Sequence, residues 1–215
     1  MLTIYGLELS SPVNKVRFTA NILGLKYELE HVDLIKGEHQ TPEFLKISES
    51  GKIPAITDGD FSLFESNAIC KYLARKESSD LYPEDILKQA KVDQWLDFVS
   101  MHINAAMVRL TFNRVMAPVF GAPVSEESIA DGEKFLARFI PVVEEQIGAN
   151  GNLASKDFSL ADVALLATLD PAEVSKFSLS DYPKLSAWRD NLKKEKFYQD
   201  CHSDFTAVIE KVMGA

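Results

Sequence analysis

Apolar and polar positions in the first third of the chain follow two different periods, which predicts a mixture of strands and helices. Residues 2–5 form a short apolar run that ends at a glycine, and residues 27–34 alternate as a second strand. Between them, residues 12–25 place apolar side chains at helical spacing. Residues 36–50 are polar with one brief apolar cluster, which predicts a loop and a short helix.

The pattern is most informative between residues 51 and 74. A short apolar strand at Ala55–Thr57 is followed by Asp58-Gly59, a dipeptide typical of hairpin turns because glycine accepts a positive φ. Residues 61–64 then alternate like a half-buried strand. Ser66 is the predicted N-cap of a helix that follows at once. The predicted order is therefore strand, helix, strand, helix, hairpin, helix.

Strands are not predicted in the second part of the chain. Residues 77–85 are polar and contain a proline, which predicts a linker. A helical apolar stripe then extends from Ile86 to Met116, where Pro118 and the residues after it are expected to break the helix. Another helix is predicted from residues 125–127 to about residue 148.

The last 60 residues are also predicted to be helical. Ser159 and Asp162 have the spacing of a capping box, with aspartate in place of the usual glutamate. We expect a structural role for this pair at the start of a helix. Two further helices are predicted over residues 182–194 and 197–213.

Composition narrows the classes of function. A net charge of −9 argues against nucleic-acid binding, which needs a basic surface. No apolar run approaches the roughly 20 residues that span a bilayer, and no secretory leader is recognised. The two cysteines, Cys70 and Cys201, lack metal-like or redox-motif spacing, and Cys70 is expected to be a small buried hydrophobe. We expect a soluble protein of a reducing compartment.

Residues 53–66 combine three groups that suit one kind of ligand. Pro54 stands at a strand entrance, a position that tolerates a cis bond, and such a bond would turn the backbone of Ile53 outward to pair with an extended chain. The N-terminus of the helix that begins near Ser66 offers unpaired N–H groups to a carboxylate. Glu65 beside it can hold an ammonium group. An α-amino acid head joined to a peptide backbone, as in glutathione, fits this set.

The residues K-I-P-A-I-x-D-G-D-x-x-L-F-E-S-x-A-I-x-x-Y-L resemble the glutathione-binding segment of cytosolic glutathione S-transferases. The resemblance extends over the whole chain. It implies a thioredoxin-like α/β domain at residues 1–77, a linker at 78–86 and an all-helical domain at 87–215. It also implies a cytoplasmic homodimer that joins the glutathione thiolate to small, mostly apolar electrophiles, with no metal.

The turn after the first strand is where the thiol chemistry is expected. This turn, residues 9–13, contains no cysteine, so thiol–disulfide exchange there is excluded, but a hydroxyl can still stabilise a bound thiolate. Because Pro12 suits the first helical position, Ser11 is the predicted N-cap and Ser10 the freer hydroxyl. Ser10 also matches the catalytic serine of the theta, delta and phi-like classes. Ser11 and Tyr5 are the alternatives.

The resemblance also assigns residues to the rest of the glutathione site. The glycine carboxylate is expected near the loop residues His39, Gln40 and Lys52, where Gln40 replaces the lysine usual in the phi class. The peptide backbone is expected against Ile53 and Pro54, and the glutamyl head against Glu65 and Ser66.

The pocket for the second substrate is less clearly encoded. Phe112, Met116 and Phe120 lie near the end of the long predicted helix and are candidates for its lining, although Met and Phe at helical spacing more often belong to a core. His102 in the same helix is expected to be a core or interface residue. A glutathione-dependent peroxidase, isomerase or dehalogenase, and a non-catalytic ligand-binding or assembly module of the same fold, remain the alternatives to conjugation.

Overall fold

A single four-stranded sheet is built from the first 64 residues. The computed structural model describes residues 1–201. In it the strands β1 (Leu2–Gly6), β2 (Tyr27–His31), β3 (Ala55–Asp58) and β4 (Phe61–Phe64) lie in the order β2-β1-β3-β4. β1 is parallel to β2, whereas β3 is antiparallel to both β1 and β4. The sheet is therefore mixed, as a thioredoxin-like domain requires.

The strands follow the alternation in the sequence. Leu2 and Ile4 of β1 are buried, whereas Thr3 and Tyr5, which alternate with them, are only partly so. Gly59 has a φ of 62° and closes the hairpin in which Asp58 pairs with Phe61. The predicted hairpin is confirmed, and β2 is shorter than the sequence predicted.

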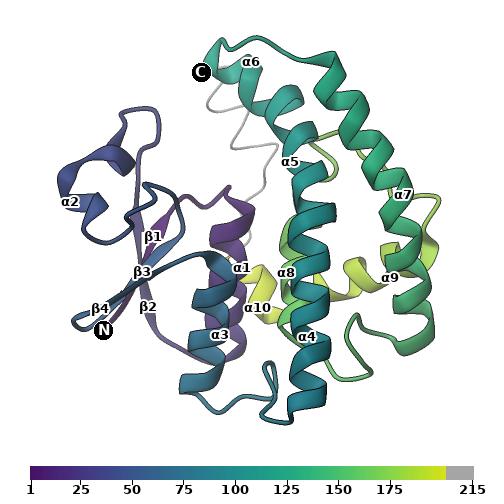
Figure 1. Ribbon diagram of the computed structural model, residues 1–215, viewed down its shortest axis with the longest axis horizontal. Coiled ribbons are helices and arrows are strands. Elements are labelled where there is room, and N and C mark those ends of the chain that lie inside the picture. Colours follow the sequence, from purple (N-terminus) through teal and green to yellow (C-terminus); the bar gives the residue numbers. More distant parts are fainter. Residues whose placement is uncertain (202–215) are drawn as a thin grey trace.

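Four helical segments accompany the sheet: α1 (Ser11–Ile22), the 3₁₀ turn η1 (Glu38–Gln40), α2 (Pro42–Leu45) and α3 (Ser66–Lys76). In Figure 1, α1 and α3 lie between the sheet and the helices of the second half, while η1 and α2 belong to a lobe on the opposite side. The predicted order of elements is confirmed.

One long helical column opens the second half. Its segments are α4 (Ile86–Phe98), η2 (Val99–Asn104), α5 (Ala105–Thr111), η3 (Phe112–Met116) and α6 (Ala117–Phe120), where η2 and η3 are π-helical (Figure 1). Of the predicted helix breakers Pro118, Gly121 and Pro123, it is Gly121, with a φ of 63°, that ends the column, and Pro118 lies within it. Pro118 is tolerated because the π turn before it has already interrupted the i→i−4 hydrogen bonds that proline would remove.

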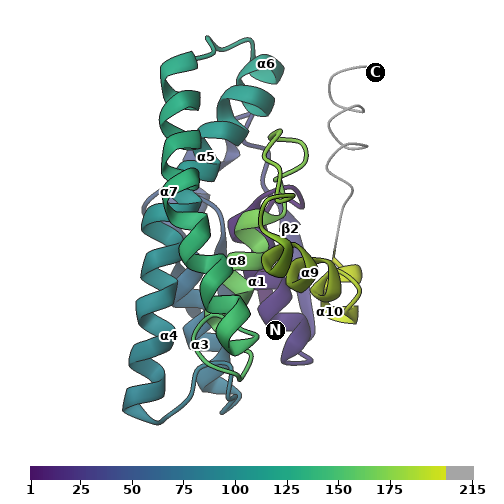
Figure 2. The same cartoon turned by 90° about the vertical axis from the view of Figure 1, so that its right-hand side faces the viewer.

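The remaining helices enclose a buried central one. They are α7 (Glu126–Asn150), α8 (Leu160–Leu169), α9 (Pro183–Leu192) and α10 (Lys196–Gln199). Every residue of α8 is buried, and this helix packs against both α1 and α4 (Figure 2). Most of the helix predicted over residues 197–213 lies outside the described residues.

One apolar core runs through both halves of the chain. It includes Ile4 and Ile56 of the sheet, Phe18 of α1 and Leu165 of α8, all with no exposed surface. Cys70 belongs to the same core and is 1% exposed, so its predicted role as a small buried hydrophobe is confirmed. Among residues 1–201 there is no helix long and apolar enough to cross a membrane.

Candidate functional site

A crevice of about 380 Å³ separates the turn after β1 from the helical column. Its floor on the sheet side contains Ser10, Ser11, Pro12 and Ile53. The opposite wall comes from η2, α5, η3 and α6 and is mostly apolar: Met107, Val108, Phe112, Val115, Met116 and Phe120. The structure thus brings the two predicted serines and the three predicted pocket residues of the helical half to one cavity.

The helix start at this crevice differs by one residue from the sequence prediction. Ser10, not Ser11, is the N-cap of α1, and its backbone carbonyl accepts a hydrogen bond from the Asn14 N–H at 2.8 Å. Ser11 is already the first helical residue, because the second helical position also lacks an intrahelical N–H partner and so tolerates Pro12. The Ser10 side chain makes no capping hydrogen bond. Its hydroxyl therefore remains available to a ligand.

Tyr5, the alternative on the first strand, is occupied elsewhere. Its hydroxyl lies 3.5 Å from the Thr57 hydroxyl on β3, and its ring packs edge-on against Phe44. Both contacts hold the side chain on the sheet. Tyr5 is absent from the crevice lining.

The loop before β3 places the other predicted backbone contacts. The Ile53–Pro54 bond is cis, and Ile53 lines the crevice while Pro54 is buried. Lys52 is exposed, and its carbonyl accepts a hydrogen bond from Ser48. The ammonium of Lys52 is thus free to turn toward the solvent side of the loop.

Gln40 and His39 lie on the η1 turn beside this loop. The Gln40 amide donates to the carbonyl of Gly51 at 3.3 Å and so has a structural contact. Nδ1 of His39 is buried and has no hydrogen-bond partner among the described residues. His39 therefore retains a polar atom that a bound group could satisfy.

At the start of α3 the predicted cap is again displaced by one residue. Glu65 is the N-cap, with φ 71° and ψ 108°, and Ser66 is the first helical residue. A non-glycine residue at this φ is uncommon, so the sequence offered no sign of it. The Glu65 side chain is exposed, and it stands next to the unpaired N–H groups of the helix. At this helix end a negative carboxylate therefore stands next to N–H groups that carry partial positive charge.

Beneath this helix end lies a lysine that sequence reasoning missed. Lys15 of α1 is 8% exposed, and its ammonium donates to the Ser66 hydroxyl at 3.0 Å and to the Asn67 amide oxygen at 2.7 Å. Burial lowers the pKa of Lys15, an effect opposed by the nearby Cys70 and Glu65. A lysine in a predicted helix normally indicates a solvated face, and its partners lie 51 and 52 residues away.

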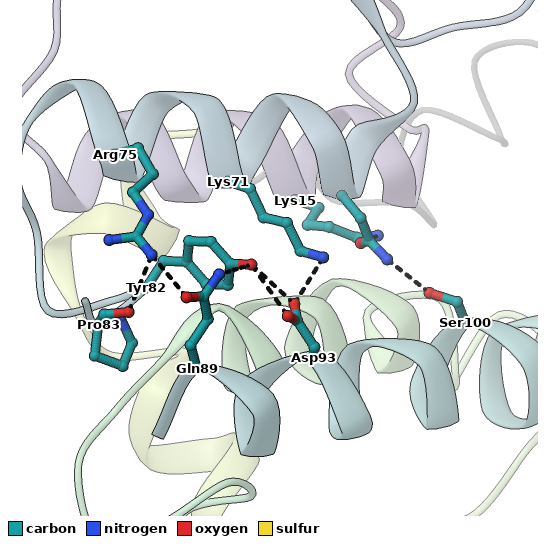
Figure 3. A network of polar contacts seen from close by, with 9 residues as sticks. Lys15, Lys71, Arg75, Tyr82, Pro83, Gln89, Asp93 and Ser100 are labelled. Atoms are coloured by element: carbon teal, nitrogen blue, oxygen red, sulfur yellow. Dashed lines mark hydrogen bonds and ion pairs between the residues drawn. The ribbon is translucent and has the colours of Figure 1, made fainter. Parts of the chain in front are cut away.

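Polar contacts fix α3 against the helical column beside this site (Figure 3). The Asn67 amide donates to Ser100 of η2 at 3.0 Å. Farther along, Lys71 pairs with Asp93 of α4 at 2.7 Å, and the Tyr82 hydroxyl donates to the same carboxylate. The start of α3 is thus held by both halves of the chain.

Asn104 is a second residue that the sequence analysis did not select. It ends the π-helical segment η2 and lines the crevice, where most neighbouring side chains of the helical half are apolar. His102, two residues earlier, stacks on Phe139 with ring centroids 4.5 Å apart, as expected for a core residue. No group of three or more His, Cys, Asp or Glu side chains suited to a metal ion occurs in residues 1–201.

Comparisons with known proteins agree with this arrangement. The family described as glutathione S-transferase, N-terminal domain, matches residues 1–75, and the corresponding C-terminal domain matches residues 103–195. Glutathione S-transferase F10 of Arabidopsis thaliana is 35% identical over 97% of this chain and 100% of its own length. Glutathione S-transferase theta-1 of Homo sapiens is 34% identical over 94% of this chain and 87% of its own length.

Solved structures show the same likeness. A glutathione S-transferase-I bound with lactoylglutathione superposes with a TM-score of 0.86 at 28% identity and covers 93% of this chain and 97% of its own. Human glutathione S-transferase T1-1 in its apo form also gives a TM-score of 0.86, at 31% identity, and covers 100% of this chain and 92% of its own.

Proposed function

The chain belongs to the glutathione S-transferase family, and we propose that it joins the glutathione thiolate to small apolar electrophiles in the crevice beside Ser10. The observation that supports this proposal is the position of the Ser10 hydroxyl. It makes no capping hydrogen bond at the start of α1, and it lines a cavity whose opposite wall is mostly apolar. One cavity therefore offers a thiolate partner and an apolar surface.

In the proposed reaction, the Ser10 hydroxyl donates a hydrogen bond to the sulfur of glutathione. This bond favours the thiolate over the thiol, so the pKa of bound glutathione falls and more nucleophile is present at neutral pH. The thiolate then attacks the electrophilic carbon, a carbon–sulfur bond forms, and the leaving group departs with its electron pair. Ser11, which lines the same crevice, is the alternative donor.

The proposed orientation of glutathione follows the charges around the crevice. The glutamyl carboxylate lies at the N-terminus of α3 with Ser66, and the glutamyl ammonium lies against Glu65. The cysteinyl backbone pairs with Ile53 beside Pro54. The glycine carboxylate lies near Lys52 and His39, with Gln40 contributing less because its amide already contacts Gly51.

The assembly and location are also part of the proposal. We propose a homodimer, which large exposed apolar side chains on both halves support, among them Phe61 at 45% and Met101 at 70% exposure. Sedimentation analysis tests the dimer.

We propose the cytoplasm as the location, since both cysteines are free and fit a reducing compartment. We retain residues 1–77 and 87–215 as the proposed domains, joined by 78–86.

A pH titration of the thiolate absorbance of bound glutathione tests the mechanism. We expect a thiol pKa at least about one unit below that of free glutathione in the wild type. Ser10→Ala should restore the ordinary value, and Ser11→Ala should not. Restoration by Ser11→Ala alone would move the role to that residue. Binding without any pKa shift in the wild type would contradict the transferase mechanism and favour a carrier of the same fold.

A further inference from the structure

We propose that Lys15 is a positioning residue for glutathione, whose buried ammonium acts through Ser66 to hold the α-carboxylate of the glutamyl group. This inference rests on the proposed function and assigns a role to a side chain that lies behind the site. In this proposal the positive charge near the glutamyl subsite comes from a residue of α1, although the subsite itself is formed by α3.

The first argument is the charge of Lys15. Its side chain is buried, yet both hydrogen-bond acceptors of its ammonium within residues 1–201, the Ser66 hydroxyl and the Asn67 amide oxygen, are neutral. Within residues 1–201 no carboxylate forms an ion pair with it. A buried cation without a counter-ion is costly, and a bound anion would remove much of that cost.

The neighbours of Lys15 leave its charge largely uncompensated. Cys70 lies in the same buried region, but burial raises the pKa of its thiol and so disfavours the thiolate as a counter-ion. Glu65 acts on Lys15 only at a distance, and its carboxylate is on the exposed side of the helix end. Burial lowers the pKa of Lys15, so a carboxylate bound at the N-terminus of α3 would supply the missing counter-ion and favour the charged form.

The second argument is the direction of the Ser66 hydroxyl. Its oxygen accepts a hydrogen bond from the Lys15 ammonium at 3.0 Å, so its own proton must point elsewhere. Ser66 is the first residue of an eleven-residue helix, where the backbone N–H groups are also unpaired. A carboxylate placed there would accept from a hydroxyl already polarised by an ammonium, and from the backbone.

The third argument is that Lys15 is held in place from both halves of the chain. Nδ2 of Asn67 donates to the Ser100 hydroxyl at 3.0 Å, which orients the amide so that its oxygen faces Lys15. A long, flexible side chain is thereby fixed before any ligand arrives. Preorganised charge of this kind needs little rearrangement on binding.

A cycle of protein and ligand variants tests the proposal. The protein variants are Lys15→Met, which keeps a long apolar side chain, and Lys15→Arg, which keeps the charge. Lys71→Met is the matched control, because Lys71 lies on α3 like Ser66 but pairs with Asp93 of α4 and makes no hydrogen bond with Ser66. The ligands are glutathione and 4-aminobutanoyl-cysteinyl-glycine, which retains the amine but lacks the α-carboxylate. Dissociation constants are measured by calorimetry.

We expect Lys15→Met to weaken glutathione binding by about tenfold or more, and binding of the analogue by less than about twofold. Lys15→Arg should restore most of the affinity, and Lys71→Met should leave it unchanged. Equal losses for both ligands, or no loss for either, would overturn the proposal while leaving the transferase function intact. A wild type that does not bind glutathione would instead overturn the proposed function.

Discussion

The buried carboxylate of Asp162 accepts a hydrogen bond from the backbone N–H of Leu153 at 2.7 Å, which ties the start of α8 to the loop after α7. The same carboxylate accepts from both the N–H and the hydroxyl of Ser159, each at 2.9 Å. The predicted capping box is thus confirmed. The Asp162 carboxylate thus satisfies three donors at the start of α8, the helix against which α1 packs.

Removal of this carboxylate should destabilise the fold. Asp162→Ala leaves buried donors without partners, so we expect the free energy of unfolding to fall by about 3 kcal/mol or more. Denaturant titration measures the change. Asp157→Ala is the control, since Asp157 is exposed and its ion pair with Lys88 is long, and it should cost less than about 0.5 kcal/mol. Equal effects of the two substitutions would contradict the structural role.

The same residue gives stability a specific pH dependence. Burial raises the pKa of Asp162 to about 6, from an ordinary value of 3.8, although its hydrogen bonds partly oppose the shift. The folded state therefore binds the proton more tightly than the unfolded state. This contribution is fully present below about pH 4 and is lost as pH rises to about 6, by up to about 3 kcal/mol.

The difference in the free energy of unfolding between wild type and Asp162→Asn separates the effect of Asp162 from the effects of other carboxylates. Two other carboxylates act on stability in the opposite way. Hydrogen bonds from Lys76 and Arg189 lower the pKa of Asp58 and that of Glu173, respectively, although burial opposes both shifts. The stabilisation that these two carboxylates provide is therefore lost as pH falls. We expect the free energy of unfolding of the wild type, relative to that of Asp162→Asn, to decrease from pH 4 to pH 6. A difference that stays constant over this range would refute the assignment.

Substitution of Glu65 should affect glutathione binding and the stability of the fold differently. Its φ of 71° costs free energy in any residue with a side chain, so Glu65→Gly should keep or raise the free energy of unfolding, within about 1 kcal/mol. Glutathione affinity should nevertheless fall about tenfold, because the partner of the glutamyl ammonium is gone. Ser78→Gly, at a φ of 50° outside the site, should show the same stability effect with unchanged affinity. Unfolding curves and calorimetry decide between the outcomes.

Phe112 should contribute to the affinity for the electrophile alone. Its side chain is 46% exposed and lines the crevice, so Phe112→Ala should raise the KM for an apolar electrophile about tenfold and leave glutathione affinity unchanged. Phe135→Ala is the control, since Phe135 is 41% exposed and lies outside the crevice. Steady-state kinetics with both substrates varied measures the two effects. An equal rise in KM for both variants would rule out this role.

Local signals in the sequence were sufficient for most of the fold. The hairpin at Asp58-Gly59 and the capping box at Ser159 could be read because each depends on residues close in sequence. The helix starts at Ser10 and Glu65 were each missed by one residue. A proline fits two successive helical positions, and a positive φ at glutamate has no sequence signature.

The parts of the site that depend on distant contacts could not be read. Lys15 contacts α3 only because α1 and α3 pack side by side, and nothing in its local pattern separates it from a solvated lysine. Asn104 lines the crevice from the end of a π-helical segment, across from residues of the other half of the chain. Both positions depend on tertiary packing, which a periodic pattern in one segment does not encode.

The two π-helical segments make the crevice sensitive to insertion and deletion. Each widened turn accommodates additional backbone length without a loop, so removal of one residue there would restore an ordinary α-helical turn and leave the helix before and after it in register. The change would be confined to the segment that carries Asn104 or the one that carries Phe112 and Met116, which line the cavity, while the N-terminal half kept its sheet and its helix ends. Substrate range in such a protein can therefore diverge through single-codon length changes within a helix, independently of the half that holds glutathione.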